Sequence, residues 1–413
     1  LFALEDKQQA DAYLELYCNR ADEPIQIVRS YMSIVAASEL ARKRRRGRTI
    51  RRVILVTVLS LLACVGTAAG LWLNRVVSSI NNGEIITDNL LATLLDSNVT
   101  QDPFYMLLLG TDGRPGEEAY RADSIILARI DPTGKQVTLI SVPRDTKVEY
   151  KGSTMKINAV FTYGASDDGS GAEEMVQAVN ELCGVEISQY AEINFDGMKA
   201  LVDAVGGIDI YVPEGDEVDD PEAGPVTIEA GQQHMDGEAA LTFCRARHQF
   251  ADGDYTRMRH QRMVLGALAD KILNNLDIAT IPSLVESLAD MVHTSLSVSD
   301  IISLVNAMRG MDVNDMYSAN IPSWAGEDTY INGQSYVFVY EDALEEMMAR
   351  VDAGEDPEGP QTMGSGGDES ATIGDLYNNS NTDWARGTAT TSGGSSDDES
   401  SGESSGSSSS SSE

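Results

Sequence analysis

The sequence predicts a layered α/β/α domain with a central mixed sheet, preceded by one transmembrane helix. Residues 104–109, 124–130 and 137–142 are short, nearly continuous apolar runs, which are typical of strands buried on both faces. Stretches with helical periodicity lie between these runs and later strand candidates, and strands interleaved with helices form layered α/β domains. A separate uncharged apolar run at residues 53–73 is long enough to cross a hydrocarbon core as a helix.

The remaining elements of the predicted domain have weaker patterns. Further strand candidates are residues 191–195, 208–212 and 240–244. The helical candidates are residues 155–163, 172–182, 196–205, 255–273, 281–291 and 299–308.

Composition divides the chain into segments. Residues 1–52 are expected to be a cytoplasmic segment, 53–73 a transmembrane signal anchor and 74–102 an extracytoplasmic stalk. Residues 103–353 have the composition of one folded domain. Residues 354–413 are rich in Gly, Ser, Asp and Glu, and we expect them to be disordered because they bury too little apolar surface.

Basic residues lie immediately before the apolar run. Positive charge next to a spanning segment is retained in the cytoplasm, so we expect the N-terminus inside and the folded domain outside the cell membrane. A cleaved signal peptide is the alternative, but its basic region would be unusually long. The basic residues are Arg42, Lys43, Arg44, Arg45, Arg46, Arg48, Arg51 and Arg52.

The formal net charge of −35 argues against nucleic-acid binding over most of the surface. A DNA-binding arm in the basic run is the alternative interpretation, and we expect no nucleic-acid partner. Two of the four cysteines, Cys183 and Cys244, follow the predicted span, where a disulfide would persist. Their pattern leaves open a disulfide between them or two buried free thiols.

Arginine and aspartate residues gather at the ends of the predicted strands. Asp112 follows the first strand, Arg121 and Asp123 precede the second, and Arg144 and Asp145 follow the third. Carboxylates at neighbouring strand ends face a shared crevice, which is the usual ligand position in an open α/β sheet. Two carboxylates together with substrate phosphate oxygens suit Mg²⁺. A turn or helix cap is the alternative role for each aspartate.

A second cluster lies between residues 244 and 262. If 240–247 is a strand, Arg245 and Arg247 project from one face, and two adjacent guanidinium groups repel unless an anion lies between them. Arg257 and Gln261 share a face of the helix predicted to follow. A pyrophosphate would satisfy this arrangement; a solvated basic face paired with nearby aspartates is the alternative.

Short motifs follow one another along the predicted domain: GTDGR at 110–114, RADS at 121–124, SVPRD at 141–145, KINAVFTYG at 156–164, AVGGIDIYV at 204–212 and MDGEAALTFCRARHQFADGDYTRMRHQ at 235–261. In this order and spacing they resemble the LytR-CpsA-Psr family over about residues 103–350. One departure is His260, because the family usually has Arg before the residue that matches Gln261.

The resemblance implies a Mg²⁺-dependent phosphotransferase outside the cytoplasmic membrane. Such enzymes move a glycopolymer from a polyprenyl pyrophosphate carrier to a peptidoglycan hydroxyl, forming a phosphodiester. By motif position, Asp112 and Asp123 are the metal ligands. The residues that match the pyrophosphate and head-group positions are Arg121, Arg144, Arg245, Arg247, Asp254, Arg257 and Gln261.

The chemistry of phosphoryl transfer agrees with these assignments. The reaction needs positioning and positive charge around a dispersing negative charge, which Arg121, Arg144 and Mg²⁺ would supply. The attacking hydroxyl must also lose a proton, and Asp145 or Asp254 is the expected acceptor. A membrane-tethered transcriptional regulator of envelope genes and a polyprenyl-pyrophosphate hydrolase are the alternative functions.

Overall fold

The computed structural model describes residues 30–38, 86–112, 121–167, 171–288, 291–325 and 329–358. The chain divides into two compact units, residues 1–75 and 76–413. Residues 30–38 of the first unit form a helix. The basic run, the predicted transmembrane helix at 53–73 and the predicted tail beyond residue 358 lie outside the described residues. Within the described ranges, no helix combines the length and apolar character needed to cross a membrane.

A six-stranded mixed sheet forms the centre of the second unit, as the sequence predicted. β1 pairs antiparallel with β2 and parallel with β6. β3 pairs antiparallel with β2 and parallel with β10, and β6 pairs antiparallel with β9. The order across the sheet is β10 (Tyr317–Asn320), β3 (Gln136–Ser141), β2 (Ala122–Asp131), β1 (Phe104–Thr111), β6 (Ile187–Asn194) and β9 (Val292–Thr294).

The central strands are buried on both faces, which explains their continuous apolar runs. Along β2, Ile125 and Leu127 pack into one core cluster, whereas Ile126 and Ala128 pack into another on the opposite face. Side chains alternate between the faces of a strand, so a strand covered on both sides must be apolar at consecutive positions. The strands predicted at 104–109, 124–130 and 137–142 are therefore confirmed.

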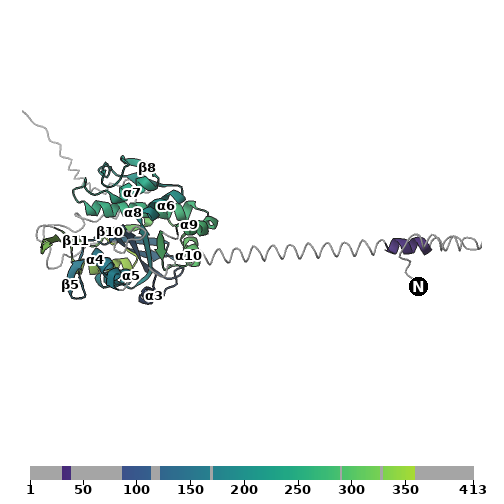
Figure 1. Cartoon of the computed structure of the whole chain (residues 1–413), viewed down its shortest axis with the longest axis horizontal. Helices are drawn as coiled ribbons and strands as arrows, with labels where there is room; N and C mark the ends of the chain where they lie inside the picture. Colours follow the sequence, from purple (N-terminus) through teal and green to yellow (C-terminus); the bar gives the residue numbers. More distant parts are fainter. Residues whose placement is uncertain are drawn as a thin grey trace, which may run out of the picture. The chain divides into compact units, whose positions relative to one another are not determined.

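Helices cover both faces of the sheet (Figure 1). On one face the core includes residues of α3, α4, α5 and α11, and on the other face it includes residues of α9 and α10. Their bounds are α3 (Asp88–Thr93), α4 (Ile157–Asp167), α5 (Gly171–Cys183), α9 (Ile281–Leu288), α10 (Val298–Met308) and α11 (Glu341–Asp352).

The two ends of the described domain pack more closely than the sequence indicated. Leu90 of α3, in the predicted stalk, is fully buried in the core on the α4 side. At the other end, the carbonyl oxygen of Pro357 accepts hydrogen bonds from the Arg350 guanidinium at 2.8 and 3.3 Å. Residues 86–94 and 354–358 therefore contact the folded domain.

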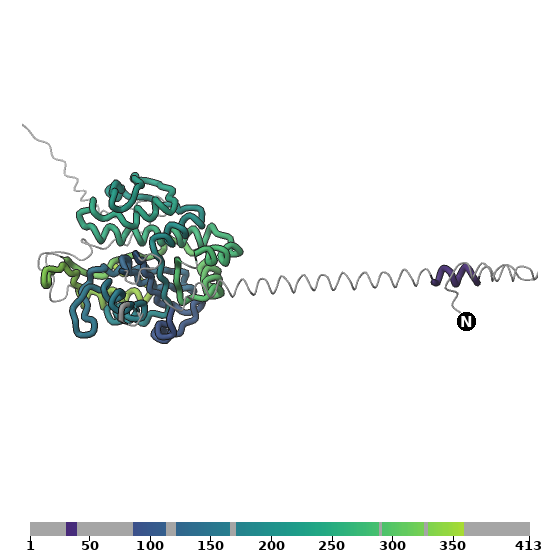
Figure 2. Tube along the Cα trace, viewed as in Figure 1, coloured from purple at the N-terminus to yellow at the C-terminus, as the bar shows by residue number. Residues whose placement is uncertain are grey.

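A third core lies beside the sheet and is built from α6 (Phe195–Ala204), β7 (Ile208–Val212), β8 (Gly231–Met235), α7 (Gly237–Arg245) and α8 (Asp254–Asp270). Figure 2 shows this part of the chain gathered on one side of the domain. The shorter elements are β4 (Lys147–Tyr150), β5 (Ser153–Lys156), β11 (Ser323–Trp324), β12 (Tyr330–Ile331), β13 (Gln334–Ser335), β14 (Phe338–Val339), η1 (Lys271–Asn275), η2 (Ile278–Thr280) and η3 (Val313–Asp315).

The strand predicted at 240–244 is wrong, because these residues lie in α7. Asp236 caps this helix: its Oδ1 accepts the backbone N–H of Ala239 at 2.9 Å. The buried residues Ala240, Phe243 and Cys244 recur at helical spacing and pack in the third core. The N-cap and the buried apolar face therefore stabilise a helix here, although the short apolar run also fits a strand.

Cys183 and Cys244 are free and buried, so the disulfide alternative is wrong and the interpretation as two buried thiols is confirmed. Cys183 lies in the core of the sheet and α5, whereas Cys244 lies in the third core. Burial raises the pKa of each thiol to about 12. Both side chains are therefore inert components of separate cores.

Candidate functional site

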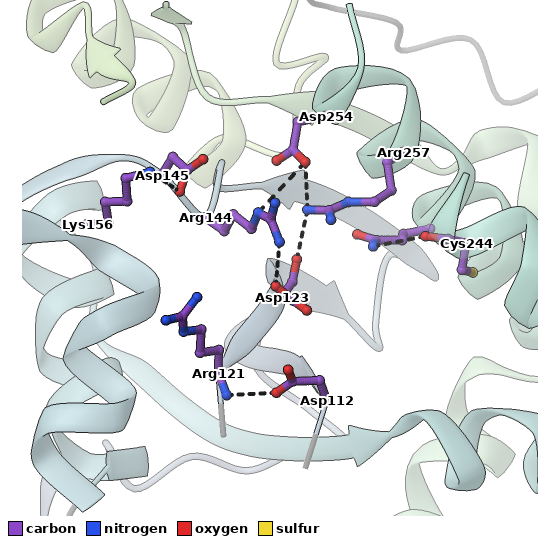
Figure 3. Close-up of polar contacts among 10 residues, drawn as sticks. Asp112, Arg121, Asp123, Arg144, Asp145, Lys156, Cys244, Asp254 and Arg257 are labelled. Atoms are coloured by element: carbon purple, nitrogen blue, oxygen red, sulfur yellow. Dashed lines mark hydrogen bonds and ion pairs between the residues drawn. The ribbon is translucent and has the colours of Figure 1, made fainter. Parts of the chain in front are cut away.

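Three of the predicted site residues meet at one edge of the sheet because of how the strands pair. Since β2 runs antiparallel to both β1 and β3, its first residues lie beside the last residues of both neighbours. Asp112 follows β1, Asp123 lies at the start of β2, and Arg144 follows β3. The sheet therefore brings together side chains from three separate motifs (Figure 3).

A β-bulge determines the position of Asp123. Gly110 pairs with Ser124 and Thr111 pairs with Ala122, which leaves Asp123 as the extra residue of β2. Gly110 lies within β1, and a Cβ added there would lie only 2.9 Å from Ser124 Cβ. The glycine thus permits a close approach of the two strands at the bulge.

Opposite charges alternate around Asp123. The Arg144 guanidinium donates to Asp123 Oδ1 at 2.6 Å, and its Nε lies 3.8 Å from Asp254 Oδ1. Arg257 Nη2 lies 2.8 Å from the same Asp254 oxygen and donates to the backbone carbonyl of Asp123 at 3.1 Å. Figure 3 shows both guanidinium groups directed at Asp123 and Asp254. Each charge in the group is thus held by at least one opposite charge.

Burial and neighbouring charges shift the pKa values of Arg144 and Arg257 in opposite directions. Burial alone would lower the pKa of Arg144, but the carboxylates of Asp254, Asp123 and Asp145 outweigh it and raise the pKa. For Arg257, which is 5% exposed, burial dominates and lowers the pKa, and the charges of Arg144 and Arg247 act in the same direction. The carboxylates of Asp254 and Asp123 act in the opposite direction, so burial is the main cause of the lowered pKa of Arg257.

Arg245 and Arg247 lie at the end of α7, not on a strand. Arg245 is the last residue of the helix, Ala246 is its extended C-cap, and Arg247 follows. The Arg245 guanidinium lies 5.1 Å from the centroid of the Phe195 ring. No acidic side chain of the described residues lies within ion-pair distance of Arg245 or Arg247. The alternative of a basic face paired with nearby aspartates is therefore wrong for these two arginines.

A cavity of about 820 Å³ joins both arginine groups. Seven predicted site residues line it: Asp112, Asp123, Arg144, Arg245, Arg247, Arg257 and Gln261. Apolar side chains also line it, including Leu108, Ile126, Ile193, Met198, Leu241 and Leu265. The cavity therefore combines a positively charged part with an apolar part, which suits an amphipathic anion.

Three predicted residues do not line the cavity. The backbone N–H of Arg121 donates to Asp112 Oδ1 at 2.8 Å, so Arg121 contributes through its main chain. Asp145 Oδ1 lies 2.9 Å from Lys156 Nζ, on the far side of Arg144 in Figure 3. Asp254 is held between Arg144 and Arg257, as described above. Neither expected proton acceptor is thus among the cavity-lining residues.

The departure at His260 does not leave a gap in the cavity. His260 is fully buried, stacks on Phe243 with ring centroids 3.8 Å apart, and has its Nδ1 3.1 Å from the Phe243 carbonyl oxygen. Its neighbour Arg259 pairs with Asp216. Arg262 donates to Ser141 Oγ at 2.6 Å, in the sheet. All three side chains therefore join elements of the fold and lie outside the cavity lining.

Asp112 and Asp123 have the ligand chemistry that Mg²⁺ requires. Each carboxylate uses one oxygen within the protein, Asp112 with the Arg121 N–H and Asp123 with Arg144. The described residues include no group of three or more His, Cys, Asp or Glu side chains that would hold a metal unaided. Mg²⁺ usually binds one or two carboxylates together with waters and substrate phosphates, so two carboxylates in a cavity that arginines also line fit this ion.

Residues outside the recognised motifs complete the site. Asp220, which is 6% exposed, lies in the loop between β7 and β8, and its Oδ2 accepts the backbone N–H groups of Arg247 and His248, each at 3.4 Å. Burial acts to raise the pKa of Asp220, but these and other backbone hydrogen bonds outweigh it and lower the pKa. Asp220 thus fixes the segment that carries Arg247. Its loop has no periodicity, so no sequence pattern indicated this role.

Comparisons with known proteins agree with the fold and the motifs. The sequence profile described as the LytR_cpsA_psr family matches residues 77–353. The polyisoprenyl-teichoic acid–peptidoglycan teichoic acid transferase TagV of Bacillus subtilis is 32% identical over 256 residues, covering 57% of this chain and 61% of TagV. The corresponding TagU of Bacillus anthracis is 31% identical over 235 residues, covering 54% of this chain and 72% of TagU.

A solved structure has the same fold. The crystal structure of B. subtilis TagV superposes with a TM-score of 0.52 at 28% identity, covering 61% of this chain and 97% of that one. The matched part of the chain thus spans less than two thirds of the full TagV sequence but nearly all of its crystal structure.

Proposed function

Because the chain belongs to the LytR_cpsA_psr family, we propose that it is an extracytoplasmic phosphotransferase. It moves a glycopolymer from a polyprenyl pyrophosphate carrier to a peptidoglycan hydroxyl and forms a phosphodiester. The names of TagV and TagU as teichoic acid transferases favour a teichoic-acid type of polymer. The observation that carries the proposal is a cavity lined by Asp112 and Asp123 together with two arginines, Arg245 and Arg247, that form no ion pair with the described residues.

The charge distribution of the cavity suits a pyrophosphate. Arg245 and Arg247 have no carboxylate partner in the described part of the chain, so their charges are available to a bound anion. Guanidinium groups bind phosphate oxygens in bidentate fashion. Arg144 is held by Asp123 and Asp254, and therefore keeps its orientation before the substrate arrives. Preorganised charge of this kind stabilises the negative charge that disperses in phosphoryl transfer.

Asp112 and Asp123 would hold Mg²⁺ against the pyrophosphate. The ion would neutralise charge on the phosphate oxygens. The protein's own contribution is to fix the two carboxylates: Asp112 by the Arg121 N–H, and Asp123 by Arg144 and the β2 bulge. The apolar lining, including Leu108, gives the first isoprene units of the carrier a place beside the charged end.

The proposed location follows from the carrier. A polyprenyl chain lies in the membrane, so a transferase that uses it must be held at the membrane surface. Residues 53–73 would anchor the chain, with the basic run on the cytoplasmic side and the folded domain outside. The partners are thus the cytoplasmic membrane, the lipid-linked glycan and peptidoglycan.

Product analysis tests the proposal. The full-length chain in detergent would be incubated with Mg²⁺, a labelled polyprenyl pyrophosphate-linked glycopolymer and peptidoglycan. We expect label in a glycan joined to peptidoglycan through one phosphate, together with released polyprenyl phosphate. Release of free glycan phosphate without attachment would instead support a hydrolase. Transfer by a chain with Arg245 and Arg247 both changed to Ala would contradict the assigned site, whereas Lys147→Ala, outside the cavity lining, is the matched control.

A further inference from the structure

The proposed reaction needs a group that removes the proton of the attacking hydroxyl. In the structure, the candidates for this group differ from the two aspartates expected from the sequence. The two acceptors expected from the sequence are already paired, Asp145 with Lys156 at 2.9 Å and Asp254 with Arg257 at 2.8 Å. Neither lines the cavity. A proton acceptor must reach the hydroxyl directly or through one water, so the cavity-lining residues are the candidates.

Two titratable side chains of the cavity lining keep their protons. Lys199 pairs with Glu238, and this hydrogen bond raises the pKa of Lys199. Burial raises the pKa of the Cys244 thiol to about 12. Apart from the arginines and the proposed metal ligands, the lining then leaves Asp196, Glu222 and His248. At neutral pH an exposed carboxylate is a much weaker base than an imidazole, so His248 is the strongest candidate.

Two carboxylates lie beside the His248 ring. Its Nδ1 lies 3.4 Å from Asp220 Oδ2 and 3.4 Å from Glu222 Oε2. The Asp220 side chain is 5% exposed and also holds the His248 backbone N–H, whereas the His248 ring is 49% exposed. Nδ1 thus faces two acids, while the ring is half-exposed and lines the cavity. A carboxylate at Nδ1 can orient an imidazole for proton transfer at Nε2.

The position of His248 in the sequence places it next to Arg247, one of the arginines proposed to bind the pyrophosphate of the carrier. It directly follows Arg247, and both residues line the cavity and are held by the same Asp220 oxygen. A phosphate bound by Arg247 would therefore lie within the same part of the cavity as His248. The charged groups that face the ring are Asp220 and Glu222, and Arg245 and Arg247 precede it on its own segment.

We propose that His248 is the general base of the transfer reaction and that Asp220 and Glu222 position it; this inference rests on the proposed function. Nε2 takes the proton of the acceptor hydroxyl as the oxygen forms a bond to the phosphorus next to the glycan. The bond from this phosphorus to the bridging oxygen breaks, and polyprenyl phosphate leaves with the electron pair. The products are the glycan phosphodiester, polyprenyl phosphate and an imidazolium that returns its proton to solvent.

Kinetics of the full-length chain with His248→Gln test the proposal. General base catalysis contributes roughly 10²- to 10⁴-fold, so we expect kcat to fall by at least about 100-fold while the Kd for the carrier changes by less than about 3-fold. We also expect added imidazole to restore part of the rate. The matched control is His234→Gln, because His234 also pairs with an aspartate, Asp209 at 2.8 Å, but lies on β8 outside the cavity lining.

The pH profile separates a base from a structural residue. The imidazole must be neutral to accept a proton, so kcat of the wild-type chain should decrease as the pH is lowered. This acidic limb of the pH profile should be absent in His248→Gln. Because Glu222 lies beside Nδ1 of the ring, Glu222→Gln should lower kcat by less than His248→Gln does and leave the Kd for the carrier unchanged. An unchanged kcat in Glu222→Gln would contradict the positioning role.

Two results would overturn the role of His248. One is a kcat for His248→Gln within about 3-fold of wild type with the acidic limb retained. The other is a loss that appears only as weaker carrier binding and is not rescued by imidazole. The proposed function is judged separately, from the products of the wild-type chain. If that chain only hydrolysed the carrier, water would replace the hydroxyl and the same variants would test the same base.

Discussion

The effects on stability of Arg247→Ala and Arg144→Ala should differ, because among the described residues Arg144 has carboxylate partners and Arg247 has none. Arg247 has no acidic partner among the described residues, so its removal takes an ion-pair partner from none of their carboxylates. Arg144 lies 2.6 Å from Asp123 Oδ1, and their side chains are 19% and 24% exposed. Removing Arg144 therefore deprives two partly buried carboxylates, Asp123 and Asp254, of a partner.

The expected magnitudes follow from these contacts. Each variant loses a charge-assisted contact to phosphate worth about 2–4 kcal/mol in the transition state, which corresponds to roughly 30- to 1,000-fold in kcat/KM. For stability, Arg144→Ala should lower the free energy of unfolding by about 1–3 kcal/mol, since it leaves the partly buried Asp123 carboxylate without its arginine donor. Arg247→Ala should change it by less than about 0.5 kcal/mol.

Transfer rates with varied carrier concentration and thermal unfolding of the same preparations measure both effects. Arg247→Lys is a useful companion, because it keeps the charge but loses the bidentate geometry, and its rate should lie between those of wild type and Arg247→Ala. The reasoning would be refuted by near-normal kcat/KM in both Ala variants. It would also be refuted if Arg247→Ala were destabilised as much as Arg144→Ala.

Other predictions concern the metal, the C-terminal residues and the cysteines. Asp112→Asn should raise the Mg²⁺ concentration that gives half-maximal transfer, and a Mg²⁺ titration with no shift would exclude it as a ligand. Deleting 359–413 should leave the melting temperature within about 1 °C, whereas also deleting 354–358 should lower it by several degrees because the contacts to Arg350 are lost. Alkylation followed by mass spectrometry should label Cys183 and Cys244 only after unfolding, without prior reduction; a need for reductant would contradict two free thiols.

Strands and helices whose sequence pattern depends only on neighbouring residues were predicted from the sequence. The three central strands were predicted because burial on both faces demands consecutive apolar residues, as in Ile125–Ala128 of β2. The helix at 172–182 was predicted from its spacing and corresponds to α5. The short run at 240–244 was misread, since a few apolar residues fit a strand or a helix until the cap at Asp236 is recognised.

Motif residues were identified by the sequence, but their pairing was not. Strand-end positions indicated that Asp112, Asp123 and Arg144 would share an edge, and the structure places them around one cavity. The same reasoning could not separate paired from unpaired arginines. Arg144 is paired because α8 brings Asp254 to it from more than a hundred residues away, and such contacts depend on how helices pack on the sheet.

The sequence by itself predicted the type of chemistry, with carboxylates for a hard cation and arginines for phosphates, and its apolar runs determined the α/β core. The tertiary structure alone decided which groups are free to act. It pairs Asp145 with Lys156 outside the cavity lining, and it brings Asp220 from the β7–β8 loop to hold the backbone of His248. The reason is physical. A residue type sets what a side chain can donate or accept, whereas its partner and its access to substrate depend on segments that only folding brings into contact.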